Sequence, residues 1–331
     1  MGGDDARDPV AEGLPDEDLY DVADWERRGT LDRAASGIYT AIRRGGTGLL
    51  VLVAALLLVA QVGVIGYAIT TQPSLGVLTL FSVVPAFLLV GFVWYHDATM
   101  REPWLPLAVT FLLAVLFASF AALANSALRP VVGGLVPVFG LFAYFYLVVA
   151  PVEEFVKWLA VRVYAFEGAG FDAVVDGAVY GAVAGLGFAT VENALYITQG
   201  ALEAGALAGA QPFTSAAVGT SVSRAFVGPG HVIYSAFAGY YLGLAKFNRE
   251  DAGPIVVKGL LVAALIHATY NSLVNVVPGL LGSALPGVPG FLLLFAFILV
   301  YDGVFGYLLY RKLSRYRSHY RRATGEAAGA D

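Results

Sequence analysis

Long apolar runs, separated by short polar stretches, follow one another through most of this chain. A helix needs about 20 mainly apolar residues to cross the hydrocarbon core of a bilayer. Because successive runs approach that length, we predict about eight transmembrane helices. These runs cover residues 48–69, 76–95, 105–128, 132–163, 174–197, 214–246, 255–277 and 287–310.

Prolines and glycines within these runs predict interruptions, because proline lacks a backbone N–H and disrupts a helix interior. Arg129 and Pro130 are expected to end the third helix. Pro137 and Pro151 are expected to bend the fourth run, which is long enough to hold a short re-entrant piece before its helix. The Gly-Pro-Gly sequence at residues 228–230 is expected to break the sixth helix.

The composition agrees with this pattern. The chain has 331 residues, of which 58% are hydrophobic and 14% are charged, whereas soluble domains average about 45–50% apolar and about 25% charged residues. We therefore predict an all-α polytopic membrane protein, integral to the cell membrane, with a buried polar site. Cysteine is absent, which excludes a disulfide framework and thiolate chemistry.

Charge divides the chain into three parts. Residues 1–45 are polar and acidic and are expected to form a flexible tail, residues 46–311 the transmembrane domain, and residues 312–331 a basic C-terminal tail. Lysine and arginine concentrate in loops on one side, and such residues mark the cytoplasmic face of a membrane. An even number of helices places both termini on that side, so both termini are predicted to be cytoplasmic.

Two adjacent carboxylates, Glu153 and Glu154, lie in the fourth run. Lys157 follows within helical reach of both. A charged side chain in hydrocarbon costs about 2.5–3.5 kcal/mol on insertion scales, so these groups are expected to face a protein interior or a wet cavity. The alternative is a pair near the membrane surface whose side chains extend toward the headgroups.

Later runs carry similar polar residues. Glu192 and Asn193 lie in the fifth run, and Arg224 lies two helical turns before His231 in the sixth. A lone histidine is often only a hydrogen-bonded core residue, and Glu192 could equally be an interfacial carboxylate at a helix end. Next to the predicted helix break, we expect His231 to be functional, because freed backbone groups need a polar cavity.

His267 and Asn271 are four residues apart, so they lie one above the other on a helix. Both side chains can donate hydrogen bonds, and two aligned donors are what a developing oxyanion requires. Their alternative role is to bridge neighbouring helices by hydrogen bonding.

Together, these polar groups predict one active site inside the membrane. A carboxylate acting as general base, with donors that stabilise an oxyanion, suits amide hydrolysis. The chain has no Gly-x-Ser-x-Gly and no His-Glu-x-x-His sequence, so the usual serine-hydrolase and zincin motifs are absent. Two other functions also fit: a proton-coupled transporter or channel, whose relays use such groups, and a non-catalytic membrane scaffold or sensor.

The polar motifs resemble those of the PrsW family of intramembrane proteases over residues 75–310. That family is similar to the CAAX prenyl endopeptidases and the bacteriocin-processing (Abi) proteins, which implies a CAAX-protease-like helical bundle. The matching sequences are Glu153-Glu154-x-x-Lys157, Phe188-x-x-x-Glu192-Asn193, Gly230-His231 with residues 239–243, and His267-x-x-x-Asn271.

The resemblance implies a role for each motif residue. Glu153 would activate a water molecule, Glu154 and Lys157 would support it, and His267 and Asn271 would form the oxyanion hole. It also implies a membrane-anchored protein substrate within the lipid bilayer and no nucleic acid, and it leaves the oligomeric state open.

Glu192 stands where the CAAX pattern has a histidine, and this departure bears on the cofactor. A metal-free mechanism is favoured by analogy with that pattern. Zinc is the alternative, because two glutamates and two histidines are suitable zinc ligands. Glu192 and His231 are counted among the catalytic residues in either case, and Asn193 and Arg224 are expected to support them. The candidate zinc ligands are Glu153, Glu192, His231 and His267.

Overall fold

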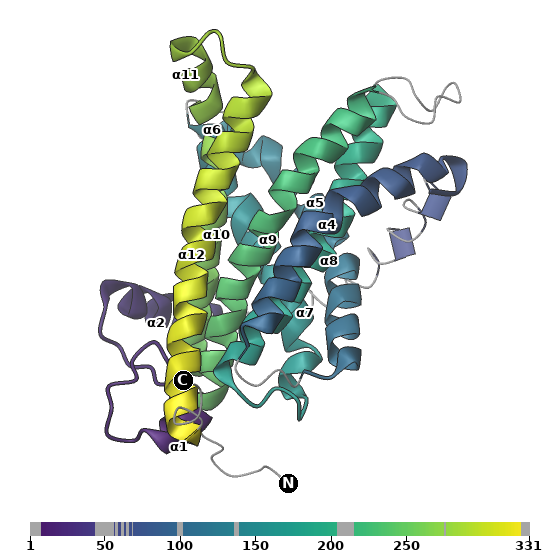
Figure 1. Ribbon diagram of the computed structural model, residues 1–331. Coiled ribbons are helices and arrows are strands. Elements are labelled where there is room, and N and C mark those ends of the chain that lie inside the picture. Colours follow the sequence, from purple (N-terminus) through teal and green to yellow (C-terminus); the bar gives the residue numbers. More distant parts are fainter. Residues whose placement is uncertain are drawn as a thin grey trace.

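The computed structural model is a bundle of long helices, with α1 and the last turns of α12 together at one end (Figure 1). It describes residues 8–43, 69–97, 102–135, 139–203, 215–274 and 276–325, and isolated residues between 56 and 67. Within these residues the regular structure is helical and no strand forms, which confirms the predicted class. The elements are α1 (Pro9–Gly13), α2 (Thr30–Arg43), α4 (Pro73–Tyr95), α5 (Trp104–Leu135), α6 (Gly140–Tyr144), η1 (Phe145–Val149), α7 (Ala150–Arg162), η2 (Ala165–Glu167), α8 (Val174–Glu203), α9 (Ser215–Phe247), η3 (Arg249–Asp251), α10 (Ala252–Leu273), α11 (Val276–Ala284) and α12 (Gly290–Thr324).

Five described helical segments are long and apolar enough to cross a membrane, which confirms a polytopic membrane protein. The predicted number of eight stays a prediction, because most of the first run, residues 48–69, lies outside the described residues. The five segments are Pro73–Tyr95, Trp104–Gly133, Val174–Ala201, Arg249–Ala284 and Gly290–Thr324.

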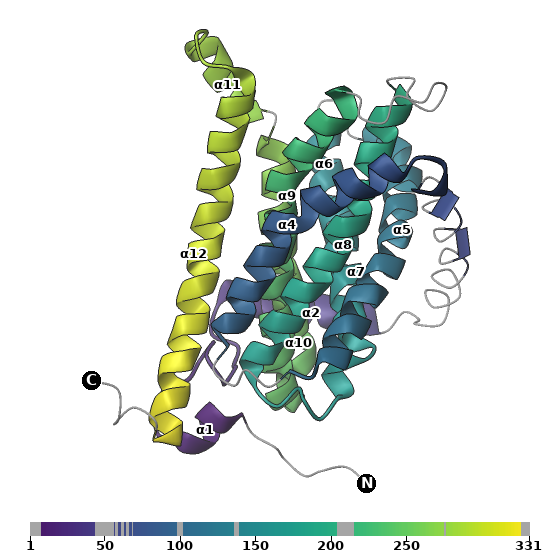
Figure 2. The same cartoon turned by 45° about the vertical axis from the view of Figure 1, so that its right-hand side comes forward.

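Helix α8 is the centre of the bundle, and α12 is at its edge (Figure 2). In α8, 94% of the most apolar 18-residue window is buried inside the protein, against 17% in α12. An apolar helix that is buried on all sides belongs to the protein interior, whereas one that exposes apolar side chains suits contact with lipid. The polar residues of α8 therefore face other helices.

Two of the predicted helix interruptions are wrong. Helix α5 continues through Pro130 to Leu135, and α9 continues through Pro229 as one helix of 33 residues. Both prolines lie inside their helices. The packing of α9 against α8 and α4 holds it helical where the Gly-Pro-Gly sequence alone would favour a break, since tertiary contacts override local propensity.

The fourth apolar run forms a continuous helical segment from Gly140 to Arg162, made of α6, η1 and α7. Element η1 is a π-helical turn, and Pro151 follows it in the first turn of α7. Single π-turns inside longer helices are frequent at functional sites. Here the turn immediately precedes Glu153. Pro137, the other predicted bend, lies outside the described residues.

Helices α8 and α9 pack so closely that their backbones touch. A Cβ added at Gly177 would lie 2.1 Å from the carbonyl oxygen of Gly239. One added at Gly185 would lie 2.4 Å from the carbonyl oxygen of His231. Small residues permit such contact between helices in a membrane. The contact at Gly185 places His231 beside α8. Gly185 lies two helical turns before Glu192 on α8.

The described part of the predicted N-terminal tail, residues 8–43, packs against the bundle. Asp8 is buried, and its carboxylate accepts hydrogen bonds from the Val174 N–H at 2.9 Å and from the Tyr316 hydroxyl at 2.7 Å. Leu19 and Trp25 are also buried. Burial of these apolar side chains stabilises the packing of the segment against the bundle. The acidic composition of the segment by itself does not predict such packing.

Salt bridges strengthen this attachment. Asp21 lies 2.7 Å from Lys312 on α12 and 3.3 Å from Lys258 on α10, while Asp32 on α2 lies 2.9 Å from Lys258. Helix α12 extends to Thr324, so much of the predicted C-terminal tail is helical. The N-terminal segment therefore ties α10 and α12 together at the end where α1 lies.

The contact between α8 and α9 predicts opposite outcomes for two glycines. Gly239→Ala places a Cβ 2.0 Å from the carbonyl oxygen of Gly177, so we expect the free energy of unfolding to fall by about 1–3 kcal/mol or more. At Gly91 on α4 nothing lies within 4 Å of the added Cβ, so Gly91→Ala should leave stability unchanged or slightly raised. Unfolding in mixed detergent micelles measures both. Equal losses would contradict the close backbone contact.

Candidate active site

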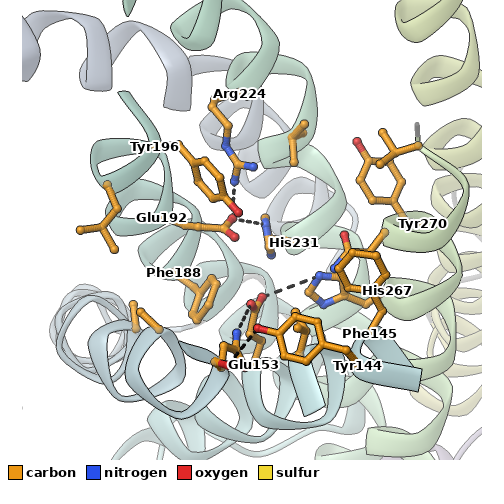
Figure 3. A pocket seen from close by; sticks show the side chains of 18 of the residues that line it. Tyr144, Phe145, Glu153, Phe188, Glu192, Tyr196, Arg224, His231, His267 and Tyr270 are labelled. Carbon is orange, nitrogen blue, oxygen red and sulfur yellow. Dashed lines mark hydrogen bonds and ion pairs between the residues drawn. The ribbon is translucent and has the colours of Figure 1, made fainter. Parts of the chain in front are cut away.

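A polar cavity of about 560 Å³ lies among α5, the α6–α7 segment, α8, α9 and α10. Figure 3 shows carboxylate, imidazole and guanidinium groups turned toward one another in it. Polar residues from separate apolar runs therefore meet in one place. Those predicted for the site that line this cavity are Glu153, Glu192, Arg224, His231, His267 and Asn271.

Glu154 lies behind the cavity wall and is fully buried. Its carboxylate accepts hydrogen bonds from Lys157 Nζ at 2.7 Å, from His267 Nδ1 at 2.9 Å and from Ser235 Oγ at 3.3 Å. Lys157 is three residues later on α7, where helical geometry brings the two side chains together. Ser235 belongs to α9 and His267 to α10. Glu154 therefore joins three helices.

A chain of contacts continues from Lys157 to the opposite wall. Lys157 Nζ donates to His231 Nδ1 at 2.9 Å, because an ammonium group can only donate. Since Nδ1 accepts, we assign the ring proton of His231 to Nε2. Nε2 lies 2.8 Å from a carboxylate oxygen of Glu192, and Arg224 contacts the same oxygen. Glu192 is thus held by two donors.

Glu153 points in a different direction from Glu154, because neighbouring residues are about 100° apart around a helix. The Asn125 side chain on α5 donates to Glu153 Oε1 at 3.0 Å. Glu153 Oε2 is buried and has no hydrogen-bond partner among the described residues. It lies 3.7 Å from His267 Nε2, which is too far for a hydrogen bond.

The His267 ring presents a lone pair to Glu153. Its Nδ1 faces the carboxylate of Glu154, which Lys157 already binds, so we assign the ring proton to Nδ1. Nε2 of the neutral ring then carries no proton. Two electron-pair donors, Glu153 Oε2 and His267 Nε2, therefore face each other in the cavity. This tautomer does not support the predicted donation from His267 to an oxyanion.

Asn193 supports the site from outside the cavity. Its Oδ1 accepts from Arg224 Nε at 2.8 Å, and its Nδ2 donates to Ser82 Oγ on α4 at 3.0 Å. The Arg224 guanidinium also lies 4.6 Å from the centre of the Tyr196 ring. These contacts hold Arg224 against Glu192. The supporting role of Asn193 and Arg224 stays a prediction.

Some residues of the site were not singled out in the sequence. Asn125 orients Glu153 and Ser235 contacts Glu154. Tyr270 lines the cavity with a buried hydroxyl. The signal available for Asn125 was an amide within the third apolar run. A serine or tyrosine in a membrane helix gives no comparable signal, because such residues are common there without any role in a site.

A second group of buried carboxylates lies outside the cavity, where α4 ends and α5 and α8 begin. Ligand atoms of Asp97, Glu102 and Asp176 lie within 4.8 Å of one another. Trp94 Nε1 donates to Glu102 at 2.9 Å, and two backbone N–H groups before α8 donate to Asp176 at 2.7 and 2.8 Å. Burial, with the neighbouring Asp97, raises the pKa of Glu102 to about 9. Because Glu102 is then uncharged at neutral pH, the repulsion among the three carboxyl groups is smaller.

Comparison with protein families gives a match over residues 102–301, to the PrsW family intramembrane metalloprotease. This segment is more than half of the chain and includes every described residue that lines the cavity. The chain belongs to the PrsW family. The resemblance found in its motifs is thereby confirmed.

Curated PrsW relatives share moderate identity with the chain. Protease PrsW of Halalkalibacterium halodurans is 30% identical over 122 residues, which are 37% of this chain and 49% of that protein. Protease PrsW of Geobacillus kaustophilus is 32% identical over 127 residues, 38% of this chain and 49% of that protein. Protease PrsW of Bacillus subtilis is 28% identical over 196 residues, 57% of this chain and 78% of that protein. The chain spans about half the length of the first two relatives. No solved structure matches it.

The description of the PrsW family as metalloproteases raises the question of which residues fit a metal ion. Ligand atoms of Glu153, His231 and His267 lie within 4.8 Å of one another, and all three residues are buried. One carboxylate and two imidazoles match the ligand set of some catalytic zinc sites. The other ring nitrogen of His267, Nδ1, donates a hydrogen bond to the carboxylate of Glu154. Metal-bound histidines commonly make such a bond.

His231 fits zinc less well than Glu153 and His267. Both of its ring nitrogens already make hydrogen bonds, to Lys157 and to Glu192. The Lys157 ammonium group, 2.9 Å from His231 Nδ1, would also repel a nearby cation. Glu192, the fourth ligand considered from the sequence, is neutralised by Arg224. The hydrogen-bond arrangement thus offers two open ligands, whereas a catalytic zinc ion takes three from the protein.

The contacts of Glu154 predict that the stability of the fold depends strongly on Lys157. Lys157→Met leaves a buried carboxylate without its cation, so we expect the free energy of unfolding to fall by about 3–5 kcal/mol. Adding Glu154→Gln to this variant should restore part of the loss, because the unpaired charge is then absent. Unfolding in mixed micelles measures both variants.

Lys246→Met is the matched control, because Lys246 is only half-buried and donates to the carbonyl oxygen of Phe166 at 2.6 Å. A loss for Lys157→Met no larger than that of the control would show that this ion pair does not hold the bundle together.

Proposed function

We propose that this protein is an intramembrane endopeptidase that hydrolyses a peptide bond of a membrane-anchored protein. Membership of the PrsW family supports a protease. One observation carries the proposal: Glu153 Oε2 and His267 Nε2 face each other at 3.7 Å inside a polar cavity. In the tautomer assigned above, His267 Nε2 carries no proton. A water molecule that bonds to both at about 2.8 Å would donate one hydrogen to each.

Glu153 is the proposed general base. Asn125 fixes its Oε1, so Oε2 is the oxygen that accepts a proton from water. The side chain is 4% exposed, so few solvent molecules compete for this oxygen. The family resemblance implies this role for Glu153, and the unpartnered oxygen supports it independently.

His267 is proposed to hold the attacking water rather than to donate to an oxyanion. Glu154 keeps the proton of the His267 ring on Nδ1, which leaves Nε2 as an acceptor. Lys157 fixes Glu154 in turn. Glu154 and Lys157 are therefore positioning residues that determine the tautomer of His267.

Glu192 and His231 form the opposite wall. Arg224 and His231 both contact one oxygen of the Glu192 carboxylate, so this carboxylate is less suited than that of Glu153 to taking a proton from water. We propose that this pair keeps the wall polar and rigid around the water. Asn271 lines the same cavity and keeps its predicted role as a donor to the substrate carbonyl.

The proposed mechanism is metal-free, as the sequence favoured. Zinc, if bound, would be held by Glu153, His231 and His267, and it would polarise the scissile carbonyl and acidify a bound water. Binding of zinc would require His231 to give up its contact with Lys157 or Glu192. The existing contacts of the three residues support water activation by Glu153 without that rearrangement.

The proposed substrate is a protein anchored in the same bilayer, because the cavity lies between helices that span it. We propose that both termini of the protease are cytoplasmic. The location of α1 and the end of α12 at one end of the bundle supports this arrangement.

Removing the base predicts loss of cleavage with an intact fold. Glu153→Gln should reduce cleavage of a tagged single-span membrane reporter in liposomes by about 10²–10⁴-fold, since general-base catalysis contributes that much. Glu102→Gln is the matched control, because Glu102 is also a buried glutamate with an unpartnered oxygen but lies outside the cavity. Retained cleavage by Glu153→Gln would remove this residue from the mechanism. Proton transport by a wild-type protein that cleaves nothing would favour the transporter alternative.

Metal analysis tests the cofactor separately. We expect elemental analysis of the purified, active protein to find no stoichiometric zinc, and cleavage to continue after chelation. His267→Ala should therefore not change metal content relative to His96→Ala, a histidine outside the cavity. One zinc ion per chain, lost in His267→Ala and required for cleavage, would overturn the metal-free mechanism.

A further inference from the structure

The Tyr270 hydroxyl is a buried donor that the proposed mechanism has not yet used. Tyr270 lies on α10, is 4% exposed and lines the cavity. Its hydroxyl is buried and has no hydrogen-bond partner among the described residues. A buried hydroxyl without a partner costs about 1–3 kcal/mol. Its presence on a residue that lines the same cavity as Glu153 and His267 suggests a partner that arrives with the substrate.

Several other donors in the cavity are already engaged. Arg224 binds Glu192 and Asn193, and Asn125 binds Glu153. The hydroxyl of Tyr144 donates to the carbonyl oxygen of Asn125 at 3.0 Å. Each of these groups would have to break a contact before it could bind a developing oxyanion.

Two further donors are excluded for similar reasons. The Tyr234 hydroxyl donates to Asp302 at 2.9 Å. His267 Nε2, as assigned above, carries no proton. An amide hydrolase needs donors aimed at the position where the oxyanion develops. Among the described residues of the cavity, Asn271 and Tyr270 are a neighbouring pair that can supply them.

Packing holds the Tyr270 ring on the cavity wall that also carries His267. Figure 3 shows it on the same side of the cavity as His267, across from Glu192. Its ring packs against Phe297 and Tyr301 of α12, with ring centres 6.0 and 5.6 Å apart. A donor whose ring is fixed by packing needs little reorganisation when charge develops.

We propose that Tyr270 is a catalytic residue whose hydroxyl, with the amide of Asn271, binds the oxyanion of the tetrahedral intermediate. This inference rests on the proposed function and replaces His267 in the predicted oxyanion hole. The water oxygen bonds to the carbonyl carbon, one water proton moves to Glu153, and the C=O π electrons move to the carbonyl oxygen. Tyr270 and Asn271 donate hydrogen bonds to that oxygen. The C–N bond then breaks, and the leaving nitrogen takes the proton from Glu153.

Tyr270→Phe removes the hydroxyl and keeps the ring that packs against α12. Using a doubly tagged single-span reporter that the wild-type protein cleaves in liposomes, we expect kcat to fall by about 10²-fold, as for loss of one oxyanion donor. KM should change less than threefold. Affinity for the intact reporter, measured in the Glu153→Gln background, should also stay unchanged, because the hydroxyl acts on the transition state.

Tyr180→Phe is the matched control. Tyr180 is fully buried on α8 and also has a hydroxyl without a partner among the described residues, but it does not line the cavity. The same substitution there should leave kcat unchanged. Thermal unfolding of both variants identifies any loss of fold. If Tyr270→Phe unfolds, Tyr270→His, which keeps a ring with a donor, must regain kcat over Tyr270→Ala for the inference to stand.

The outcomes separate this inference from the proposed function. Suppose that Glu153→Gln abolishes cleavage, but a folded Tyr270→Phe variant keeps the wild-type kcat. This result would overturn the role of Tyr270 and leave the protease proposal intact. A proportional loss of kcat and of reporter affinity would also overturn it, because it would indicate a binding role. If no form of the protein cleaves the reporter, both the role of Tyr270 and the protease proposal are overturned.

Discussion

Glu154 carries a negative charge into the interior of an apolar bundle, where Lys157, His267 and Ser235 neutralise or bind it. A buried charge without such partners would cost several kcal/mol. Helices α7, α9 and α10 must therefore keep their relative positions. The same contacts set the tautomer of His267 and, through Lys157, the orientation of His231. The stability of the bundle and the geometry of its cavity depend on one carboxylate.

The two adjacent glutamates have different roles because the helix turns them about 100° apart. Glu154 points among the helices and has all its contacts made, whereas Glu153 points into the cavity and keeps one oxygen without a partner. Buried polar groups in proteins are normally satisfied. Two of the exceptions among the described residues, Glu153 Oε2 and the Tyr270 hydroxyl, belong to residues of the cavity wall, where a water molecule and a substrate would complete them.

Close contact between α8 and α9 gives the cavity its other wall. The glycines of α8 allow the backbone of α9 to approach, and this approach brings His231 next to Glu192. It also keeps α9 helical through Pro229, where the local sequence predicted a break. The N-terminal segment contributes at the other end of the bundle, since Asp8 and Asp21 attach it to α8, α10 and α12.

The sequence by itself determined the all-α membrane class, the family and the polar residues that meet in the cavity, because charged groups in apolar runs are costly and therefore conspicuous. It did not determine which atoms carry protons or which groups are left without partners. Those properties depend on contacts between helices far apart in the chain, such as Glu154 with His267 and Glu153 with Asn125. The proposed role of His267 as acceptor and the unpartnered hydroxyl of Tyr270 thus rest on tertiary structure alone, because a hydrogen bond fixes a proton only when both partners are in place.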